Sequence, residues 1–425
     1  MNQKWIVLII TIVMYTAVVI FQHRKAWITL IAAALIVVLG IFSPLEALAQ
    51  VNWSVLLIYI GSLILAELFI YSKVPVRIAD DIILSSPNAG IAIVILLVIT
   101  GLISAFVENV ATVMVMAPIA LALCSKLKMS PIAFMAGLAV MANLQGTATL
   151  VGDPPSMIFA SFANYGFNDF FIYAGRPSIF FVVQIGMLAG AIYFLFVFSR
   201  ENKLKISIEK EPILSPVPGI LLILMILGLA LVSFLHRGIS LLAGLMVTGL
   251  GICGLLWYVF IRKEEFSSAF KLIKNLDWET ILFLIGIFIV IGAVSEVGLL
   301  NDLVIFLQNI IGSNVVLGFI TIILVSVLVS GFVDNVPYII AMLPVSSGLA
   351  SHLGLKPELY MFALLVGSCL GGNLTPFGAS ANIAAIGILK KEGITLNFPG
   401  WLKIGLPFTL ITTACAALFL WYIWI

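Results

Sequence analysis

Two acidic residues within long apolar runs, Glu108 and Asp334, are the side chains of this sequence best suited to binding a cation. Each is followed by an asparagine, in the segments Ser104-Ala105-Phe106-Val107-Glu108-Asn109-Val110 and Ser330-Gly331-Phe332-Val333-Asp334-Asn335-Val336, which lie 226 residues apart. Carboxylate and amide oxygens are the ligands that hard cations prefer. We therefore predict a Na⁺ site that uses Glu108, Asn109, Asp334 and Asn335.

The alternative is that these acids only cap helices. Asp334 precedes a predicted helix that carries Pro337 in its first turn, which is a good N-cap arrangement. Glu is a poor cap, however, and both copies of the segment keep an acid. An ionisable group inside a membrane is costly and marks a functional site by default, so we favour ion or proton handling.

A Gly- and Thr-rich interruption follows each acidic segment at the same offset. Gly146, Thr149 and Gly152 correspond in this way to Gly372, Thr375 and Gly378. One such break would be an ordinary kink, whereas two in register favour a binding site. Together with the first turn after Glu108, the breaks supply these further candidates for a substrate or ion: Thr112, Thr147, Thr149, Gly152, Asp153, Ser156, Asn373, Thr375, Gly378, Ser380 and Asn382.

The charges near these motifs are mostly negative. Glu108, Asp153 and Asp334 converge, and no Lys or Arg lies in the centre of any of the four interrupted segments. This balance favours a cation, a proton relay, or a neutral or cation-escorted solute over a bare anion. Glu67 and Glu296 we interpret as helix-end groups. Four scattered cysteines and three loop histidines have no metal-ligand spacing, so we expect no cofactor beyond a coupling ion, H⁺ or Na⁺.

Composition defines the class of protein that must position these residues. Of 425 residues, 63% are hydrophobic and 9% charged, with a mean hydropathy of +1.24. A soluble domain needs roughly 25% charged residues. Many apolar runs reach the roughly 20 residues that span a bilayer as a helix. We predict an all-α polytopic membrane protein whose partner is the lipid bilayer, with no nucleic acid.

The duplication predicts two inverted-topology repeats of five crossings each, at 1–199 and 219–425, joined by a charged cytoplasmic linker at 200–218. Each repeat contains a re-entrant hairpin, at 91–124 and 315–350. Each also contains a broken helix that crosses once, at 131–165 and 357–389. An odd number of crossings inverts the second repeat, and paired discontinuous elements of this kind are typical of secondary transporters.

The Lys and Arg distribution orients the chain. Seventeen of the 21 basic residues, including Arg24 and Lys25, fall in segments assigned to one side, and four fall on the other. This bias predicts the cytoplasmic (inner) membrane with both termini outside. Exchanging the roles of hairpin and broken helix gives sixteen to five, so charge alone leaves that choice open.

At these motifs the chain resembles the ion transporter superfamily, in particular its group of arsenite pumps, D-type sodium/proton antiporters and the pink-eyed dilution protein, which are citrate-transporter-like permeases. The matching motifs are the two acidic segments and the breaks 146–155 and 371–382. The resemblance implies a dimerising scaffold and a mobile transport unit in an elevator-type mechanism. Dicarboxylate and sulfate relatives carry Ser-Asn-Thr at each tip, so Glu108-Asn109-Val110 argues against dicarboxylate transport.

We therefore predict a homodimeric secondary active transporter of a small inorganic ion, coupled to H⁺ or Na⁺, with antiport favoured. An arsenite or similar metalloid efflux permease, taking a neutral hydroxide, is the first alternative, and a sodium-coupled anion or carboxylate symporter is the second. A channel belongs to a different class, as does an intramembrane aspartyl protease. We expect no enzyme, since Gly152-Asp153 lacks the rest of a GxGD protease motif.

Overall fold

The structure is a computed structural model that describes residues 3–21, 24–199, 210–236 and 238–425. Its N-terminal part contains α1 (Gln3–Ile20), α2 (Lys25–Val38), α3 (Pro44–Gln50), α4 (Trp53–Tyr71), α5 (Val74–Ser85), α6 (Ala89–Ser104), α7 (Asn109–Leu127), α8 (Ile132–Gly146), α9 (Pro154–Ala163), the short helix η2 (Asn168–Phe170), the paired strands β1 (Ile172–Tyr173) and β2 (Arg176–Pro177), and α10 (Ile179–Val197).

The C-terminal part continues with a similar series. It contains α11 (Val217–Leu235), α12 (Leu241–Leu256), the π-helix η3 (Trp257–Ile261), α13 (Phe266–Lys274), α14 (Trp278–Glu296), α15 (Leu299–Ile311), α16 (Val315–Ser330), α17 (Asn335–His352), α18 (Glu358–Gly371), α19 (Ser380–Lys391) and α20 (Phe398–Trp424).

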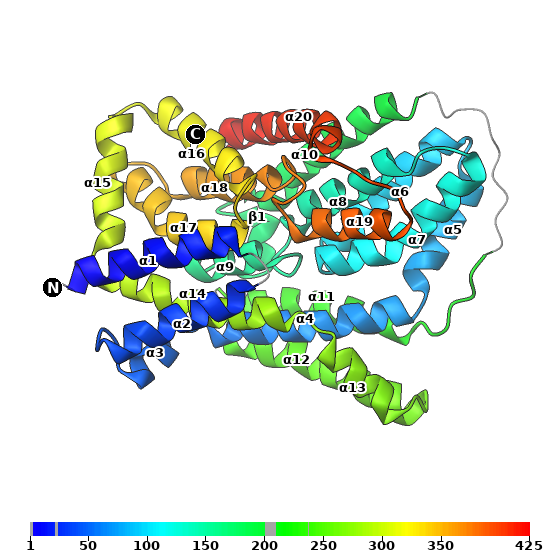
Figure 1. Cartoon of the computed structure of the whole chain (residues 1–425), viewed down its shortest axis with the longest axis horizontal. Helices are drawn as coiled ribbons and strands as arrows, with labels where there is room; N and C mark the ends of the chain where they lie inside the picture. Colours follow the sequence, from blue (N-terminus) through cyan, green and yellow to red (C-terminus); the bar gives the residue numbers. More distant parts are fainter. Residues whose placement is uncertain (1–2, 22–23, 200–209, 237) are drawn as a thin grey trace.

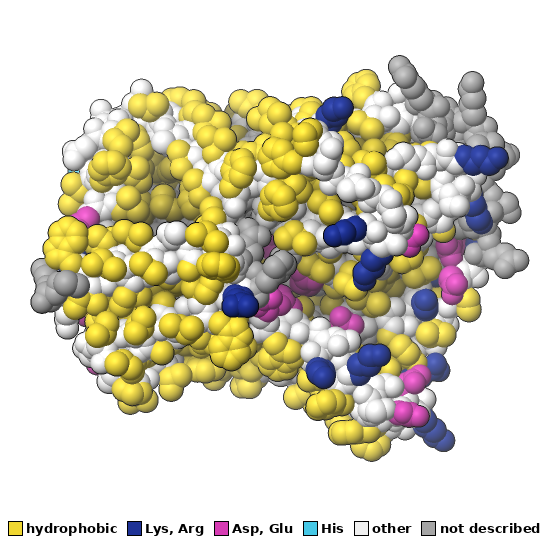
Figure 2. Space-filling view, viewed as in Figure 1, with side chains coloured by type: hydrophobic (Ala, Val, Ile, Leu, Met, Phe, Trp, Pro, Cys, Tyr) yellow, Lys and Arg dark blue, Asp and Glu magenta, His cyan; other side chains and the backbone are white. Residues whose placement is uncertain are grey.

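The prediction of an all-α polytopic membrane protein is confirmed. Among the described residues, eight helices are long and apolar enough to cross a membrane, or nine if one bent pair, α15 with α16, counts as a single span. Shorter apolar helices such as α6, α8 and α18 account for the remaining apolar segments. In Figure 2, hydrophobic side chains cover most of the visible face, and charged side chains gather toward the end where α5 and α13 lie.

Helical structure is interrupted inside all four segments where breaks were expected. The acids themselves start the second helix of each hairpin: the Glu108 carboxylate accepts a hydrogen bond from Ala111 N at 2.8 Å, and Asp334 accepts one from Val336 N at 3.1 Å. These bonds satisfy N–H groups that lack partners inside a helix. The capping interpretation therefore describes part of what both acids do.

The two hairpins approach the middle of the molecule from opposite ends. Figure 1 shows α5, α6 and α7 toward one end of the long axis and α15, α16 and α17 toward the other. Helix α6 packs on α8, and α16 packs on α18. Helix α19 packs on α7 and α8, while α9 packs on α17, so each broken helix has contacts with both hairpin regions.

Close helix pairs form a second region, in which α4 packs on α12 and α2 packs on α14. A glycine sits at each crossing. A Cβ on Gly61 would lie within 2.8 Å of the backbone of Thr248, and one on Gly286 would lie equally close to Thr29 and Leu30. The Thr248 hydroxyl donates across its crossing to Leu57 O at 2.7 Å, whereas the Thr29 hydroxyl lies 3.1 Å from the carbonyl oxygens of Lys25 and Ala26 in its own helix and 3.5 Å from Phe283 O across the crossing.

Short helices that the sequence analysis did not anticipate connect these regions: α3 and the amphipathic helices α5, α13 and α15. Near α5, Lys210 Nζ lies 2.6 Å from Asp81. The hydrogen bond from Lys210 lowers the pKa of the Asp81 carboxyl, and Arg77 lowers it further. Most of the charges of the predicted linker 200–218 fall in 200–209, which lies outside the described residues.

Candidate functional site

The two hairpin tips, both breaks and the start of α14 line one cavity of about 470 Å³. Of the residues predicted from sequence, the cavity brings together Glu108, Asn109, Asp153, Asp334, Asn335, Gly378 and Ser380. Side chains from α2, α4, α8 and α14 complete its wall. Residues more than 200 positions apart in the sequence thus share one polar chamber.

At the first tip, Asn109 connects the hairpin to the break in the facing broken helix. Its amide oxygen accepts a hydrogen bond from Ser104 Oγ at 2.7 Å, and its side chain also hydrogen bonds to Asp153. Asp153 caps α9 by accepting from Ser156 N at 3.2 Å. The Asn109 side chain occupies the space beside Gly146, where any Cβ would collide with it.

At the second tip, the acid is paired with a base. Lys25 Nζ lies 2.8 Å from Asp334 Oδ2, and the two side chains are only 14% and 24% exposed. Tyr15 on α1 donates from its hydroxyl to the carbonyl oxygen of Pro337, in the first turn of α17, at 2.8 Å. Lys25 was expected in a loop with its neighbour Arg24, but it is the first residue of α2 and brings a basic side chain to the site from outside the four interrupted segments.

A third group of acids comes from α14 and the turn before it. Asp277 accepts a hydrogen bond from Tyr59 at 3.2 Å and caps α14 through Thr280 N at 3.0 Å. Glu279 also lines the cavity, as does Glu67 from α4. Glu67 was interpreted as a helix-end group, and the structure places it in the cavity wall instead. Sequence reasoning missed Asp277 and Glu279 because they resemble ordinary residues at a helix start.

Amide side chains tie the two broken helices together. Asn143 Nδ2 on α8 donates to Asn373 Oδ1 at 3.0 Å and to Asn382 Oδ1 at 2.8 Å. Asn382 in turn donates to Gly372 O and Thr375 O, both at 2.9 Å. Asn143 was not among the predicted residues. An asparagine within an apolar helix, three positions before a break, was the available signal.

The remaining predicted residues lie behind the cavity wall and hold the breaks in shape. Thr149 and Thr375 each donate to a hairpin carbonyl, of Ala105 and Gly331 respectively. Thr112 bonds to the Glu108 carbonyl at 3.0 Å. The residues that the structure places outside the cavity lining are Thr112, Thr147, Thr149, Gly152, Ser156, Asn373, Thr375 and Asn382.

The acids share the cavity without meeting at one point. Six carboxylates line it, those of Glu67, Glu108, Asp153, Asp277, Glu279 and Asp334, and Lys25 is the one base among the described lining residues. In the part of the chain that the structure describes, no three His, Cys, Asp or Glu side chains are close enough to hold one metal ion. A cation here would therefore bind one or two carboxylates together with amide, hydroxyl or carbonyl oxygens.

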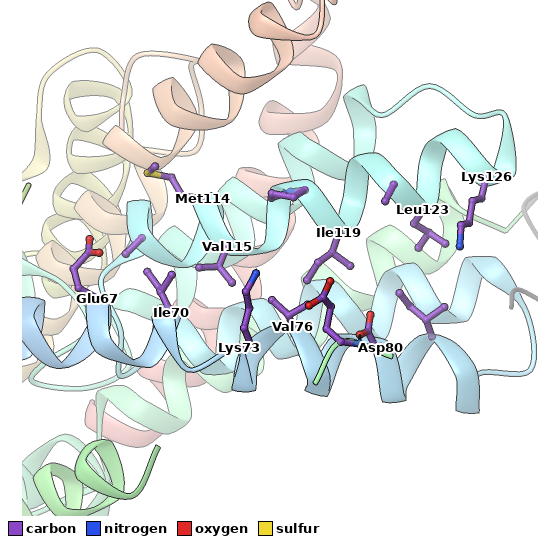
Figure 3. Close-up of a pocket in the computed structure, with 15 residues that line it drawn as sticks. Glu67, Ile70, Lys73, Val76, Asp80, Met114, Val115, Ile119, Leu123 and Lys126 are labelled. Atoms are coloured by element: carbon purple, nitrogen blue, oxygen red, sulfur yellow. Dashed lines mark hydrogen bonds between the residues drawn. The ribbon is translucent and has the colours of Figure 1, made fainter. Parts of the chain in front are cut away.

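A second, larger cavity of about 860 Å³ lies between α7 and the continuous wall of α4 and α5 (Figure 3). Glu67, Ala111 and Met114 line both cavities, so the two adjoin there. In Figure 3, Glu67 and Met114 lie at one end and Lys126 at the other, with Lys73 and Asp80 between them along α4 and α5. The outer cavity extends from the inner chamber toward the charged end of the molecule.

Comparison with known proteins adds a family and a fold. The family model described as CitMHS, citrate transporter, matches residues 6–367. An uncharacterized transporter of Mycobacterium tuberculosis is 28% identical over 98% of each chain. The human P protein is 23% identical over 77% of this chain and 48% of its own. The solved structure of the YdaH transporter of Alcanivorax borkumensis superposes with a TM-score of 0.60 at 14% identity, over 90% of this chain and 86% of that one.

Proposed function

The chain belongs to the CitMHS citrate transporter family and is a multi-pass membrane transporter, and from this premise we propose that it carries a small inorganic cation across the cytoplasmic membrane against H⁺ or Na⁺. The observation that supports this proposal is the acidic cavity between the two hairpin tips. Six carboxylates with one lysine attract cations and repel a bare anion. Such a charge balance is costly in a membrane unless cations or protons occupy part of it.

In this proposal Glu108 is the principal cation ligand. Asn109 and Asp153 lie beside it and supply amide and carboxylate oxygens, while Asn335, Gly378 and Ser380 face it from the opposite tip and break. Na⁺ and H⁺ would compete for the same carboxylate, which gives antiport from one site. The residues behind the wall, Thr149 and Thr375 among them, keep the tips on the breaks.

The proposed movement is elevator-like. The hairpins and broken helices pack on one another, and α2, α4, α12 and α14 form the close pairs beside them. The repeated offset of 226 residues, the hairpins at opposite ends in Figure 1 and the seventeen-to-four distribution of basic residues support two inverted repeats, 1–199 and 219–425, with outside termini. Dimerisation through the scaffold is part of the same proposal.

The outer cavity is the proposed access route. Because Glu67 lines both cavities, it is the carboxylate that an ion moving along this route meets before Glu108. Glu67 lies four residues before the C-terminal residue of α4, at the junction between the two cavities.

A carboxylate escorted by a cation is the second candidate substrate. The family description names citrate, and Lys25 supplies one positive group in the cavity. Six acids would repel free citrate, so this candidate requires that the carboxylate enters together with a metal ion or with several Na⁺ or H⁺ ions.

Flux measurements in proteoliposomes test the proposal. The purified protein is reconstituted, pH and Na⁺ gradients are imposed in turn, and uptake is measured for Na⁺, Li⁺, K⁺, arsenite, citrate alone and citrate with Mg²⁺. We expect saturable, gradient-coupled cation movement that Glu108→Gln abolishes. Glu296→Gln is the matched control, because Glu296 is an exposed residue at the end of α14.

Each other outcome identifies a rival. Uptake of citrate only with Mg²⁺ would favour the escorted carboxylate, and movement of arsenite without coupling to either cation would favour metalloid efflux. Flux that rises linearly with substrate concentration and is unaffected by the imposed pH or Na⁺ gradient would indicate a channel and contradict the proposal.

A further inference from the structure

We propose that the Lys25 ammonium is a built-in cation that occupies Asp334, so that only the first hairpin presents an acid for a transported cation. This inference rests on the proposed function, because it assigns the cation to one of the two acidic tips. It concerns the number of ions bound and the residue that limits that number.

The geometry supports a substitute cation. Lys25 Nζ lies 2.8 Å from Asp334 Oδ2, and the ammonium also sits 5.3 Å from the centroid of the Phe283 ring on α14. A carboxylate on one side and an aromatic face on another are the partners that a monovalent cation finds in proteins. Asp277 and Glu279 lie near enough to act on Lys25 through their charge. These contacts hold the Lys25 ammonium in the cavity.

The pair also joins two regions of the molecule. Lys25 is the first residue of α2, which packs on α14, whereas Asp334 starts the second helix of the hairpin α16–α17. Together with the bond from Tyr15 to Pro337 O, the ion pair holds the second tip against α1 and α2. Any movement of that hairpin along α2 must first break this buried pair.

Among the described residues no Lys or Arg forms an ion pair with the acid of the first tip, and the helix crossings show a matching difference between the two halves. Thr29 and Thr248 occupy matching places, each packed on a glycine of the partner helix, Gly286 or Gly61. Four residues before Thr29 is Lys25, and four residues before Thr248 is Gly244. Gly244 carries no side chain and packs on Ser54 and Leu57. At this matched position one half of the chain has the cationic side chain of Lys25 and the other has the glycine Gly244.

Removing the lysine should convert Asp334 into an additional cation site. In Lys25→Met the Asp334 carboxylate loses its ammonium partner. Removing that positive charge makes the net charge of an already acidic cavity more negative by one. A buried carboxylate without a partner is unfavourable, so it recruits a cation from solution. Asn335, Ser380 and the backbone around Gly378 line the same side of the cavity and offer further oxygens.

Equilibrium binding of radioactive Na⁺ to the purified full-length protein measures this directly. At mildly alkaline pH, Lys25→Met should bind one Na⁺ per protomer more than the wild type, and Lys25→Met/Asp334→Asn should lose that extra ion. Lys25→Arg, which keeps the charge, should retain the wild-type number. Lys4→Met is the matched control, since Lys4 forms an ion pair with Asp302 away from the cavity, at 2.6 Å.

The outcomes separate this inference from the proposed function. If Glu108→Gln abolishes wild-type Na⁺ binding but Lys25→Met binds the wild-type number, the inference is overturned and the proposed function stands. If the wild type binds no Na⁺ while Lys25→Met gains an Asp334-dependent ion, the inference stands and the role of Glu108 fails. Absence of Na⁺ binding in every variant overturns both. Lys25→Gln replaces Lys25→Met if gel filtration shows that the methionine variant does not fold.

Discussion

The tips of the hairpins α6–α7 and α16–α17 have the same backbone arrangement but different chemistry around their acids. In both, a threonine of the facing break donates to a carbonyl of the tip, Thr149 to Ala105 O and Thr375 to Gly331 O. In both, the acid caps the second helix of its hairpin. The threonine bonds recur 226 residues apart, as the duplicated sequence does, whereas the cap bond comes from Ala111 N at the first tip and from Val336 N at the second, because the position equivalent to Ala111 is Pro337.

The side chains around the acids differ. At the first tip, Ser104 donates to Asn109, whereas the corresponding Ser330 is buried and has no hydrogen-bond partner among the described residues. Asp153 in the first break corresponds to Ala379 in the second. Lys25 pairs with Asp334, and in the described part of the chain no Lys or Arg forms an ion pair with Glu108.

The comparison shows that the two copies share a backbone arrangement and differ in the charges around their acids. The first tip gathers negative charge and amide oxygens. The second tip is neutralised by the ammonium of Lys25. The following variants test the proposal that only the first tip binds the transported cation.

Glu108→Gln should have the largest effect. A unit charge at about 4 Å contributes about 4 kcal/mol at the effective dielectric constant of a partly buried site, so losing it should lower cation affinity roughly 100- to 1000-fold. Binding and coupled flux of Na⁺ measure the loss. Adding Lys25→Met should leave Glu108→Gln inactive in transport, and recovery of transport in that double variant would contradict the division between the tips.

Asp334→Asn should come next, by a different mechanism. It leaves the Lys25 ammonium in the cavity without a counter-charge, which should lower cation affinity at Glu108 about tenfold, or about 1.4 kcal/mol. Adding Lys25→Met removes the stranded charge and should restore affinity to near the wild-type value. The Na⁺ concentration that gives half-maximal transport reports both changes. Equal, unrescued losses in Asp334→Asn and Glu108→Gln would mean that the tips are equivalent.

Asp153→Asn should weaken Na⁺ binding by roughly three- to tenfold while keeping the fold, because Asn caps a helix about as well as Asp. With one negative charge fewer, the site also attracts protons less strongly. Na⁺ binding should therefore persist to lower pH in the variant than in the wild type. Binding isotherms recorded across a pH series decide this, and superimposable pH profiles would restrict Asp153 to capping α9.

Thr149→Val and Thr375→Val should have the smallest effects, and equal ones. Each removes one hydrogen bond to a buried hairpin carbonyl, which contributes on the order of 1 kcal/mol. Thermal unfolding of the purified variants should show two similar decreases in melting temperature. A large loss at one position and none at the other would show that the shared backbone bonds of the two tips are not energetically equivalent.

Much of this arrangement follows from local sequence. The apolar composition predicted the all-α membrane fold, and the duplicated motifs indicated where helices α6 to α9 and α16 to α19 are interrupted. These features depend on residues close together in the chain: an acid that caps a helix, a glycine beside an asparagine, a proline after a break. The breaks also gather about half of the predicted site residues around one cavity.

The rest depends on packing that local patterns do not encode. Its neighbours in the sequence, Arg24 among them, predict that Lys25 lies in a loop. Only the packing of α2 on α14 brings it to Asp334. Asp277 and Asn143 were missed for the same reason. A helix-start aspartate and a single asparagine are common, and their partners, Tyr59 and Asn382, lie more than 200 residues away.

The glycine crossings limit which parts of the molecule can deform. At Gly61 and Gly286 the helices approach so closely that neither position has room for a Cβ, and at Gly61 the Thr248 hydroxyl also bonds across the contact. Sliding of α4 along α12, or of α2 along α14, would drive a neighbouring side chain into a backbone that leaves no room for a Cβ. Each pair therefore behaves as one stiff body with few internal degrees of freedom. Movement between such bodies, rather than within them, is therefore what this packing permits.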